Sequence, residues 1–235
     1  MDILFVCAGN IVRSVIAECV FRRKLEETPG KASGLIEIAS SGIEAEDNSA
    51  PHPDCIRALE ALGINSCDTT STRADEEHMD RSDLVITMTR QQSYVIAGKF
   101  PDYRHKCFSL IEINGVIETI LDTRGGRPGD YEPFNDFGRL NEVALREGLS
   151  KAASTLQGVR RESMRPLAGV PLSIQELMTR FAPCFYQVSG VHDPLGGTLE
   201  EVVSCAQQID SEVTLLLRGL LALAASESGE GKSQQ

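Results

Sequence analysis

The chain has 235 residues, 41% of them apolar, which is enough to bury one sizeable hydrophobic core. Its formal net charge of -11 excludes broad binding of nucleic acids, because their phosphate backbones require a basic surface.

The cysteines and the apolar runs of the sequence indicate where the protein acts. Seven cysteines stand at irregular spacings without a C-x-x-C pair, so we expect reduced thiols and neither a zinc site nor any other metal site. The apolar run at residues 3–6 is too short for a signal peptide, and the run at 215–225 is too short to cross a bilayer. We therefore expect a cytoplasmic protein that does not bind membranes.

The N-terminal half alternates between strand-like and helix-like segments. Short apolar runs predict strands at residues 3–6, 35–39, 83–88 and 106–110. Apolar positions at helical spacing predict helices at residues 15–27, 53–62 and 91–100. This alternation predicts an α/β fold, a small doubly wound parallel sheet of about four strands with helices on both faces.

The C-terminal half departs from this alternation. Residues 115–190 are predicted to form a largely helical and loop insertion, with helices at 143–157 and 173–181 and a loop at 125–130. A long amphipathic helix follows Thr198, which forms a capping-box pattern with Glu201. We expect a single domain over residues 1–225 that contains the insertion, and a flexible tail at 226–235.

The segment between the first strand and the first helix combines several features that bind anions. Its backbone N–H groups and the positive end of the following helix can face a phosphate, and Arg13 can donate two parallel hydrogen bonds to it. A thiol attacks as the thiolate, which these groups and the Ser14 hydroxyl would stabilise. With Cys7 as the nucleophile, the predicted phosphate-binding loop comprises Cys7, Ala8, Gly9, Asn10, Ile11, Val12, Arg13 and Ser14.

This C-x5-R-S loop resembles the signature of the bacterial low-molecular-weight protein-tyrosine phosphatases, a family that includes a protein-arginine phosphatase branch. The resemblance covers roughly residues 1–114 and 190–222. It implies that Cys7 forms a cysteinyl-phosphate, that Arg13 stabilises the transition state, and that Asn10 keeps the loop in shape. It also implies a phosphorylated protein as substrate and no cofactor. Ser41 is a candidate for supporting the loop, or an ordinary turn serine.

The family places its general acid in an Asp-Pro pair on a late loop, and this chain has one such pair, Asp193-Pro194. A carboxylic acid there can protonate the leaving group and then activate the water that hydrolyses the intermediate. The resemblance therefore makes Asp193 the candidate acid. Three carboxylates of the insertion compete with it: Asp122, Asp130 and Asp136.

The loop also departs from the family. Val12 stands where the family has a second cysteine, and Val15 stands where it has proline. The tyrosine phosphatases have isoleucine at the position of Ile11, whereas the arginine branch has threonine there. In contrast, Leu195-Gly196-Gly197 after the Asp-Pro pair is more similar to the arginine branch. We expect phosphotyrosine as the substrate, with phosphoarginine as the alternative.

Two further hypotheses are less favoured. The first is an arsenate reductase, although Cys55 and Cys67 lack the spacing expected of its relay thiols. The second is a phosphate-binding module without catalytic activity, which the altered positions 12 and 15 and the insertion suggest.

Overall fold

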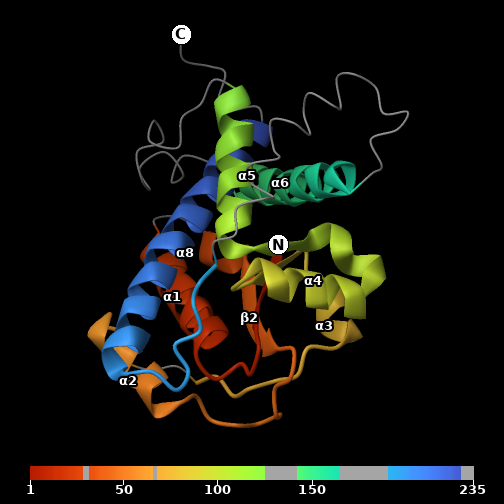
Figure 1. Ribbon diagram of the computed structural model, residues 1–235. Coiled ribbons are helices and arrows are strands. Elements are labelled where there is room, and N and C mark those ends of the chain that lie inside the picture. The colour runs from red at the N-terminus through yellow and green to blue at the C-terminus, as the bar shows by residue number, and fades with distance from the viewer. Residues whose placement is uncertain (29–31, 66–67, 125–141, 165–189, 229–235) are drawn as a thin grey trace.

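The computed structural model describes residues 1–28, 32–65, 68–124, 142–164 and 190–228 (Figure 1). Four parallel strands form one sheet in the order β2-β1-β3-β4. Their bounds are Asp2–Cys7 for β1, Glu37–Gly42 for β2, Leu84–Thr87 for β3 and Cys107–Ser109 for β4. The predicted strands are confirmed, but β2 begins two residues later than predicted, and Leu35 and Ile36 are buried in the core ahead of it.

Helices cover both faces of the sheet, so the doubly wound α/β fold is confirmed. One face packs against α1 (Arg13–Glu27), α2 (Pro53–Ala61), α5 (Leu110–Thr123), α6 (Glu142–Ser163) and α8 (Leu199–Glu227). The other packs against α3 (Glu76–Arg81) and α4 (Arg90–Lys99). Short 3-10 helices span Ala32–Gly34 (η1) and Pro101–Lys106 (η2). In Figure 1, α8 runs alongside α1 and α5.

The region after β4 differs from the expectation in its boundaries. The helix α5 starts directly after β4 and runs across residue 115, where the insertion was predicted to begin. It packs closely on α8, since a Cβ atom at Gly219 would lie 2.7 Å from Ile117. The predicted helix at 143–157 is confirmed as α6 but extends to Ser163, and α8 extends two residues into the predicted tail. The predicted loop at 125–130 and helix at 173–181 lie outside the described residues.

The helix α6 belongs to the core of the protein. Its Arg160 donates to Glu112 of α5 at 3.0 Å, with both side chains buried, and its guanidinium lies 5.4 Å from the ring centroid of Phe108. Gln157 donates to the carbonyl of Asp83, the residue before β3. Near its other end, Gly148 touches the backbone of Ala224 in α8. Among the described helices, none is long and apolar enough to cross a membrane.

Two glycines of α6 test this packing. A Cβ atom at Gly148 would lie 2.2 Å from the Ala224 carbonyl oxygen, whereas one at Gly158 would meet nothing within 4 Å. We expect Gly148→Ala to lower the free energy of unfolding by about 1–3 kcal/mol. The matched Gly158→Ala should raise it by ~0.5–1 kcal/mol, because alanine is the better helix former. Urea denaturation measures both, and equal effects would show that α6 does not pack tightly on α8.

Candidate functional site

The predicted phosphate-binding loop lies at the carboxyl edge of the sheet, between β1 and α1. Cys7 is the last residue of β1, and Arg13 is the first residue of α1. Neighbouring segments hold the loop through its carbonyl groups: Ile43 N donates to Cys7 O at 3.0 Å, Glu44 N to Ala8 O at 2.9 Å, and His52 N to Ile11 O at 2.9 Å. The structure thus keeps the eight predicted residues together around the end of one buried strand.

Hydrogen-bond donors surround the Cys7 sulfur. Cys7 Sγ lies 3.0 Å from Ser14 Oγ and accepts from the Asn10 backbone N–H at 3.3 Å. Asn10 Nδ2 donates to Ser14 Oγ at 2.9 Å, which leaves the Ser14 hydroxyl proton for the sulfur. Donors in these positions stabilise a thiolate at Cys7.

Asn10 is fully buried and adopts a left-handed backbone conformation, with φ at 53°. Asparagine tolerates this region better than most residues. The Asn10 side chain is buried. Its Nδ2 also donates to Ser40 Oγ at 2.8 Å, and its Oδ1 accepts from Thr72 N at 2.9 Å. Asn10 therefore ties the loop to two other segments of the chain.

Ser40, and not Ser41, supports the loop, which corrects the expectation for Ser41. Ser40 pairs with Phe5 in the sheet and so shares the face of Cys7, whereas Ser41 pairs with Val6 on the opposite face. The Ser41 hydroxyl is buried and has no hydrogen-bond partner in the part of the chain that the structure describes. The alternation of side chains along β2 was the signal that could have identified Ser40.

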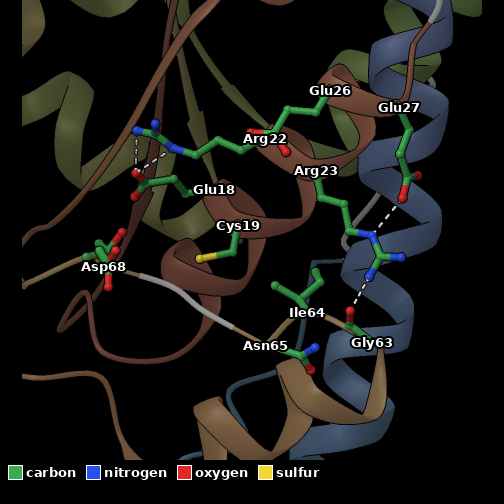
Figure 2. Close-up of a pocket in the computed structure, with 11 residues that line it drawn as sticks. Glu18, Cys19, Arg22, Arg23, Glu26, Glu27, Gly63, Ile64, Asn65 and Asp68 are labelled. Atoms are coloured by element: carbon green, nitrogen blue, oxygen red, sulfur yellow. Dashed lines mark hydrogen bonds and ion pairs between the residues drawn. The ribbon is translucent and has the colours of Figure 1, made fainter.

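A buried carboxylate links Ser40 to the surface. Ser40 Oγ donates to Glu18 Oε2 at 2.6 Å, and Arg22 donates to Glu18 Oε1 at 2.8 and 3.1 Å. Figure 2 shows this pair in the wall of a cavity of about 580 Å³ behind α1, where Arg23 pairs with Glu27. Its arginines are paired with glutamates of the same helix and no residue of the phosphate-binding loop lines it, so this cavity is not the candidate site. No role for Glu18 was expected from the sequence.

Gly42 lets β2 approach the phosphate loop closely. It pairs with Cys7 in the sheet, and a Cβ atom there would lie 2.7 Å from Ala8 O and 2.8 Å from Asn10 N. Any side chain at this position would push the loop away from β2.

The candidate acid lies against the candidate phosphate-binding arginine. The side chain of Arg13 is buried and forms an ion pair with Asp193, while its Nη1 donates to Val191 O at 3.3 Å. The loop that carries Asp193 is held by Val191 N, which donates to Met88 O at 2.8 Å, next to the end of β3. Residues 180 positions apart therefore meet at one site.

The other acidic candidates do not lie at the loop among the described residues, and His192 adjoins Asp193 in the wall of a groove that the loop also lines. Asp193 is half exposed, whereas Asp122 is an exposed residue near the end of α5. Asp130 and Asp136 lie outside the described residues. His192 is exposed. Asp193 is thus the carboxylate that the described structure places at the loop.

Three further thiols, those of Cys55, Cys107 and Cys205, are also buried. Burial raises the pKa of Cys55 to about 12, of Cys107 to about 12 and of Cys205 to about 11. Cys19 is disulfide-bonded, so the expectation that the cysteines are reduced is wrong for this residue. Among the described residues, no cluster of three or more histidines, cysteines or carboxylates could hold a metal ion.

Comparison with known proteins identifies relatives of the chain. Residues 2–121 match the family Low molecular weight phosphotyrosine protein phosphatase. The chain is 35% identical over 163 residues to a protein-arginine-phosphatase of Bacillus subtilis, covering 68% of this chain and 100% of that protein. It is 29% identical over 131 residues to the low molecular weight protein-tyrosine-phosphatase PtpB of Staphylococcus haemolyticus, covering 56% and 87%.

A solved structure supports the same fold. The YwlE arginine phosphatase from Geobacillus stearothermophilus superposes with a TM-score of 0.56 at 18% identity, covering 100% of this chain and 97% of that one. At this identity the likeness concerns the fold alone. It agrees with the four-stranded parallel sheet flanked by helices.

The two adjacent serines of β2 give a matched test of the support network. Ser40→Ala removes the donor to the buried Glu18 Oε2 and one of the two acceptors of Asn10 Nδ2, so we expect the free energy of unfolding to fall by about 1–3 kcal/mol. Ser41→Ala removes a hydroxyl that makes no bond among the described residues, so it should be neutral or stabilising. Thermal and urea denaturation measure both, and a larger loss for Ser41→Ala would contradict the network.

The buried thiols predict a pattern of alkylation. At pH 8 the thiols of Cys55, Cys107 and Cys205 stay protonated, because this pH lies well below pKa values of about 12, 12 and 11. We expect iodoacetamide to leave these three unmodified in the native protein and to modify them in urea, as measured by peptide mass spectrometry. Equal rates with and without urea would show that these thiols are accessible.

Proposed function

The chain belongs to the low molecular weight phosphotyrosine protein phosphatase family and is a cysteine-based phosphatase, and on that premise we propose that it hydrolyses phosphotyrosine in proteins through a cysteinyl-phosphate at Cys7. One observation carries the assignment of roles. The structure places the Cys7 sulfur among hydrogen-bond donors on a loop whose arginine, Arg13, pairs with the carboxylate of Asp193.

The first step transfers the phosphoryl group to the enzyme. The substrate dianion replaces Asp193 on the Arg13 guanidinium, which binds two phosphate oxygens, while the loop N–H groups bind the rest. The Cys7 thiolate attacks phosphorus, and the bond between phosphorus and the tyrosine oxygen breaks. Asp193 takes up a proton from solvent once the phosphate has replaced it on Arg13, and it gives that proton to the departing oxygen. Tyrosine leaves and Cys7 carries the phosphoryl group.

The second step returns the enzyme to its starting state. Asp193, now a carboxylate, accepts a proton from a water molecule that attacks phosphorus. The bond between phosphorus and sulfur breaks, which releases inorganic phosphate and the Cys7 thiolate. Ser14 and the Asn10 N–H stabilise this thiolate as a leaving group.

The choice of phosphotyrosine is supported by Ile11. The tyrosine phosphatases that the loop resembles have isoleucine at this position, whereas the arginine branch has threonine, and the residue lies inside the predicted phosphate-binding loop. Phosphoarginine is the alternative, since a protein-arginine-phosphatase is among the relatives and Gly196-Gly197 resembles that branch. Paired phosphotyrosine and phosphoarginine peptides of one sequence distinguish the two, and equal or reversed rates would overturn the preference.

Hydrolysis of 4-nitrophenyl phosphate tests the roles of Cys7 and Asp193. We expect the wild-type protein to turn over this substrate without added metal and Cys7→Ser to abolish turnover. Asp193→Asn removes the proton donor, so kcat should fall by about 10²–10⁴. The loss should be smaller for aryl phosphates with more acidic leaving groups, which need less protonation.

Asp122→Asn is the matched control, because this carboxylate lies exposed near the end of α5. It should leave kcat unchanged. Turnover by Cys7→Ser would exclude Cys7 as the nucleophile, and an equal loss in the two aspartate variants would remove Asp193 from the acid role. Wild-type protein that binds phosphate without turnover would favour the binding module, and thiol-dependent reduction of arsenate would favour the reductase.

A further inference from the structure

Gly190 lies shortly before Asp193 in the chain, and it touches the short segment that joins β3 to α4. A Cβ atom at Gly190 would lie 2.9 Å from the Cα atom of Thr89 and 3.0 Å from its Cβ and Cγ2 atoms. A side chain does not fit so close to a backbone carbon, so any other residue at position 190 would push the two segments apart. Glycine thus permits a contact that no other residue permits.

Thr89 is the more firmly held side of this contact, because hydrogen bonds fix both its backbone and its side chain. It caps α4: its Oγ1 accepts from Gln92 N at 3.2 Å, and its N donates to Gln92 Oε1 at 3.2 Å. Its carbonyl accepts from Thr87 Oγ1 at 2.8 Å. A side chain at position 190 would therefore displace the segment that leads to Asp193, and not Thr89.

Val191 connects Gly190 to the groups that carry the proposed chemistry. Its side chain is fully buried, and its N donates to Met88 O at 2.8 Å. Its carbonyl accepts from Arg13 Nη1 at 3.3 Å. Asp193, two residues later, forms the ion pair with the same arginine. A displacement at Gly190 would therefore change the place of Asp193 relative to a phosphate bound by Arg13.

We propose that Gly190 is a positioning residue for the general acid, and that its close contact with Thr89 sets the place of Asp193 relative to the leaving group. The inference rests on the proposed function, because it concerns the residue that protonates the departing oxygen. It assigns a part in the reaction to the packing of residue 190 on the segment after β3, rather than to a further reacting group.

Proton transfer is sensitive to a displacement of this kind. The donor must lie within hydrogen-bond reach of the oxygen, at about 2.6–3.2 Å. A misplacement of about 1 Å can cost roughly 10²-fold in rate. The loss is largest for a weakly acidic leaving group, because a more acidic one departs with less protonation. The dependence of rate on the leaving group therefore reports where the acid stands.

Two aryl phosphates separate the acid from other effects of a substitution. We measure kcat/KM for phenyl phosphate and divide it by kcat/KM for 4-nitrophenyl phosphate, whose leaving group is more acidic. This ratio cancels a loss of folded protein and a weaker hold on phosphate. We expect Gly190→Ala to lower the ratio about tenfold. Gly98→Ala in α4 is the matched control, since a Cβ atom there would meet nothing within 4 Å, and it should keep the wild-type ratio.

A double variant shows whether the effect passes through Asp193. Asp193→Asn should lower the ratio by itself. Adding Gly190→Ala to it should lower the ratio no further, because both changes act on the same proton transfer. If Gly190→Ala does not fold, Thr89→Ser replaces it in the test. This variant keeps the capping hydroxyl and removes the Cγ2 methyl that faces Gly190, so it loosens the same contact and should also lower the ratio.

Two results would overturn the inference while leaving the proposed function intact. One is an unchanged ratio in Gly190→Ala, or in Thr89→Ser where that variant replaces it, although Asp193→Asn lowers the ratio. The other is a further fall when Gly190→Ala is added to Asp193→Asn. An unchanged ratio in Asp193→Asn itself would instead overturn the acid role in the proposed function, and this inference with it.

Discussion

The buried amide of Asn10 is the interaction on which the candidate site depends. Its left-handed backbone turns the loop so that its N–H points at the Cys7 sulfur, and its side chain bonds to Ser14, Ser40 and the Thr72 N–H. The hydroxyl oxygens of Ser14 and Ser40 both accept from the Asn10 amide. Each hydroxyl can therefore donate its own proton, Ser14 to the Cys7 sulfur and Ser40 to Glu18. Hydrogen-bond donors in these positions would stabilise a thiolate, and the N–H groups of the loop would stabilise a bound phosphate dianion.

The second half of the site comes from the far end of the chain. Asp193 reaches Arg13 because residues 190–193 lie against the end of β3 and lead into α8, which packs along α1 and α5. The helix α6 is joined to α5, in the same layer of helices, by the buried ion pair between Arg160 and Glu112. A pair of this kind is costly to break once buried, which gives α6 a defined place in the core although it lies between the two halves of the site in sequence.

The sequence predicted the strands, their parallel arrangement and the loop, because apolar runs and a compact motif are local signals and the alternation of strands with helices indicates a parallel sheet. It did not predict α5, although Leu110, Ile113, Ile117 and Ile120 recur at helical spacing, since the irregular region that follows obscured this pattern. Glu18 lacked a local signal, because its role arises only when β2 is in register with β1 and brings Ser40 to it, whereas Ser40 could have been identified from the alternation of side chains along β2. Ser41 lies on the opposite face of β2, because successive side chains of a strand alternate between its two faces.

Trapping of the phosphorylated enzyme tests the central claim most directly. Rapid acid quenching during turnover of an aryl phosphate, followed by peptide mass spectrometry, locates the phosphoryl group. We predict one phosphoryl group on the sulfur of Cys7, accumulating to no more than one per chain. A phosphoryl group on any other residue, or turnover without a phosphorylated enzyme in the quenched samples, would contradict the account of a donor-lined sulfur that attacks phosphorus.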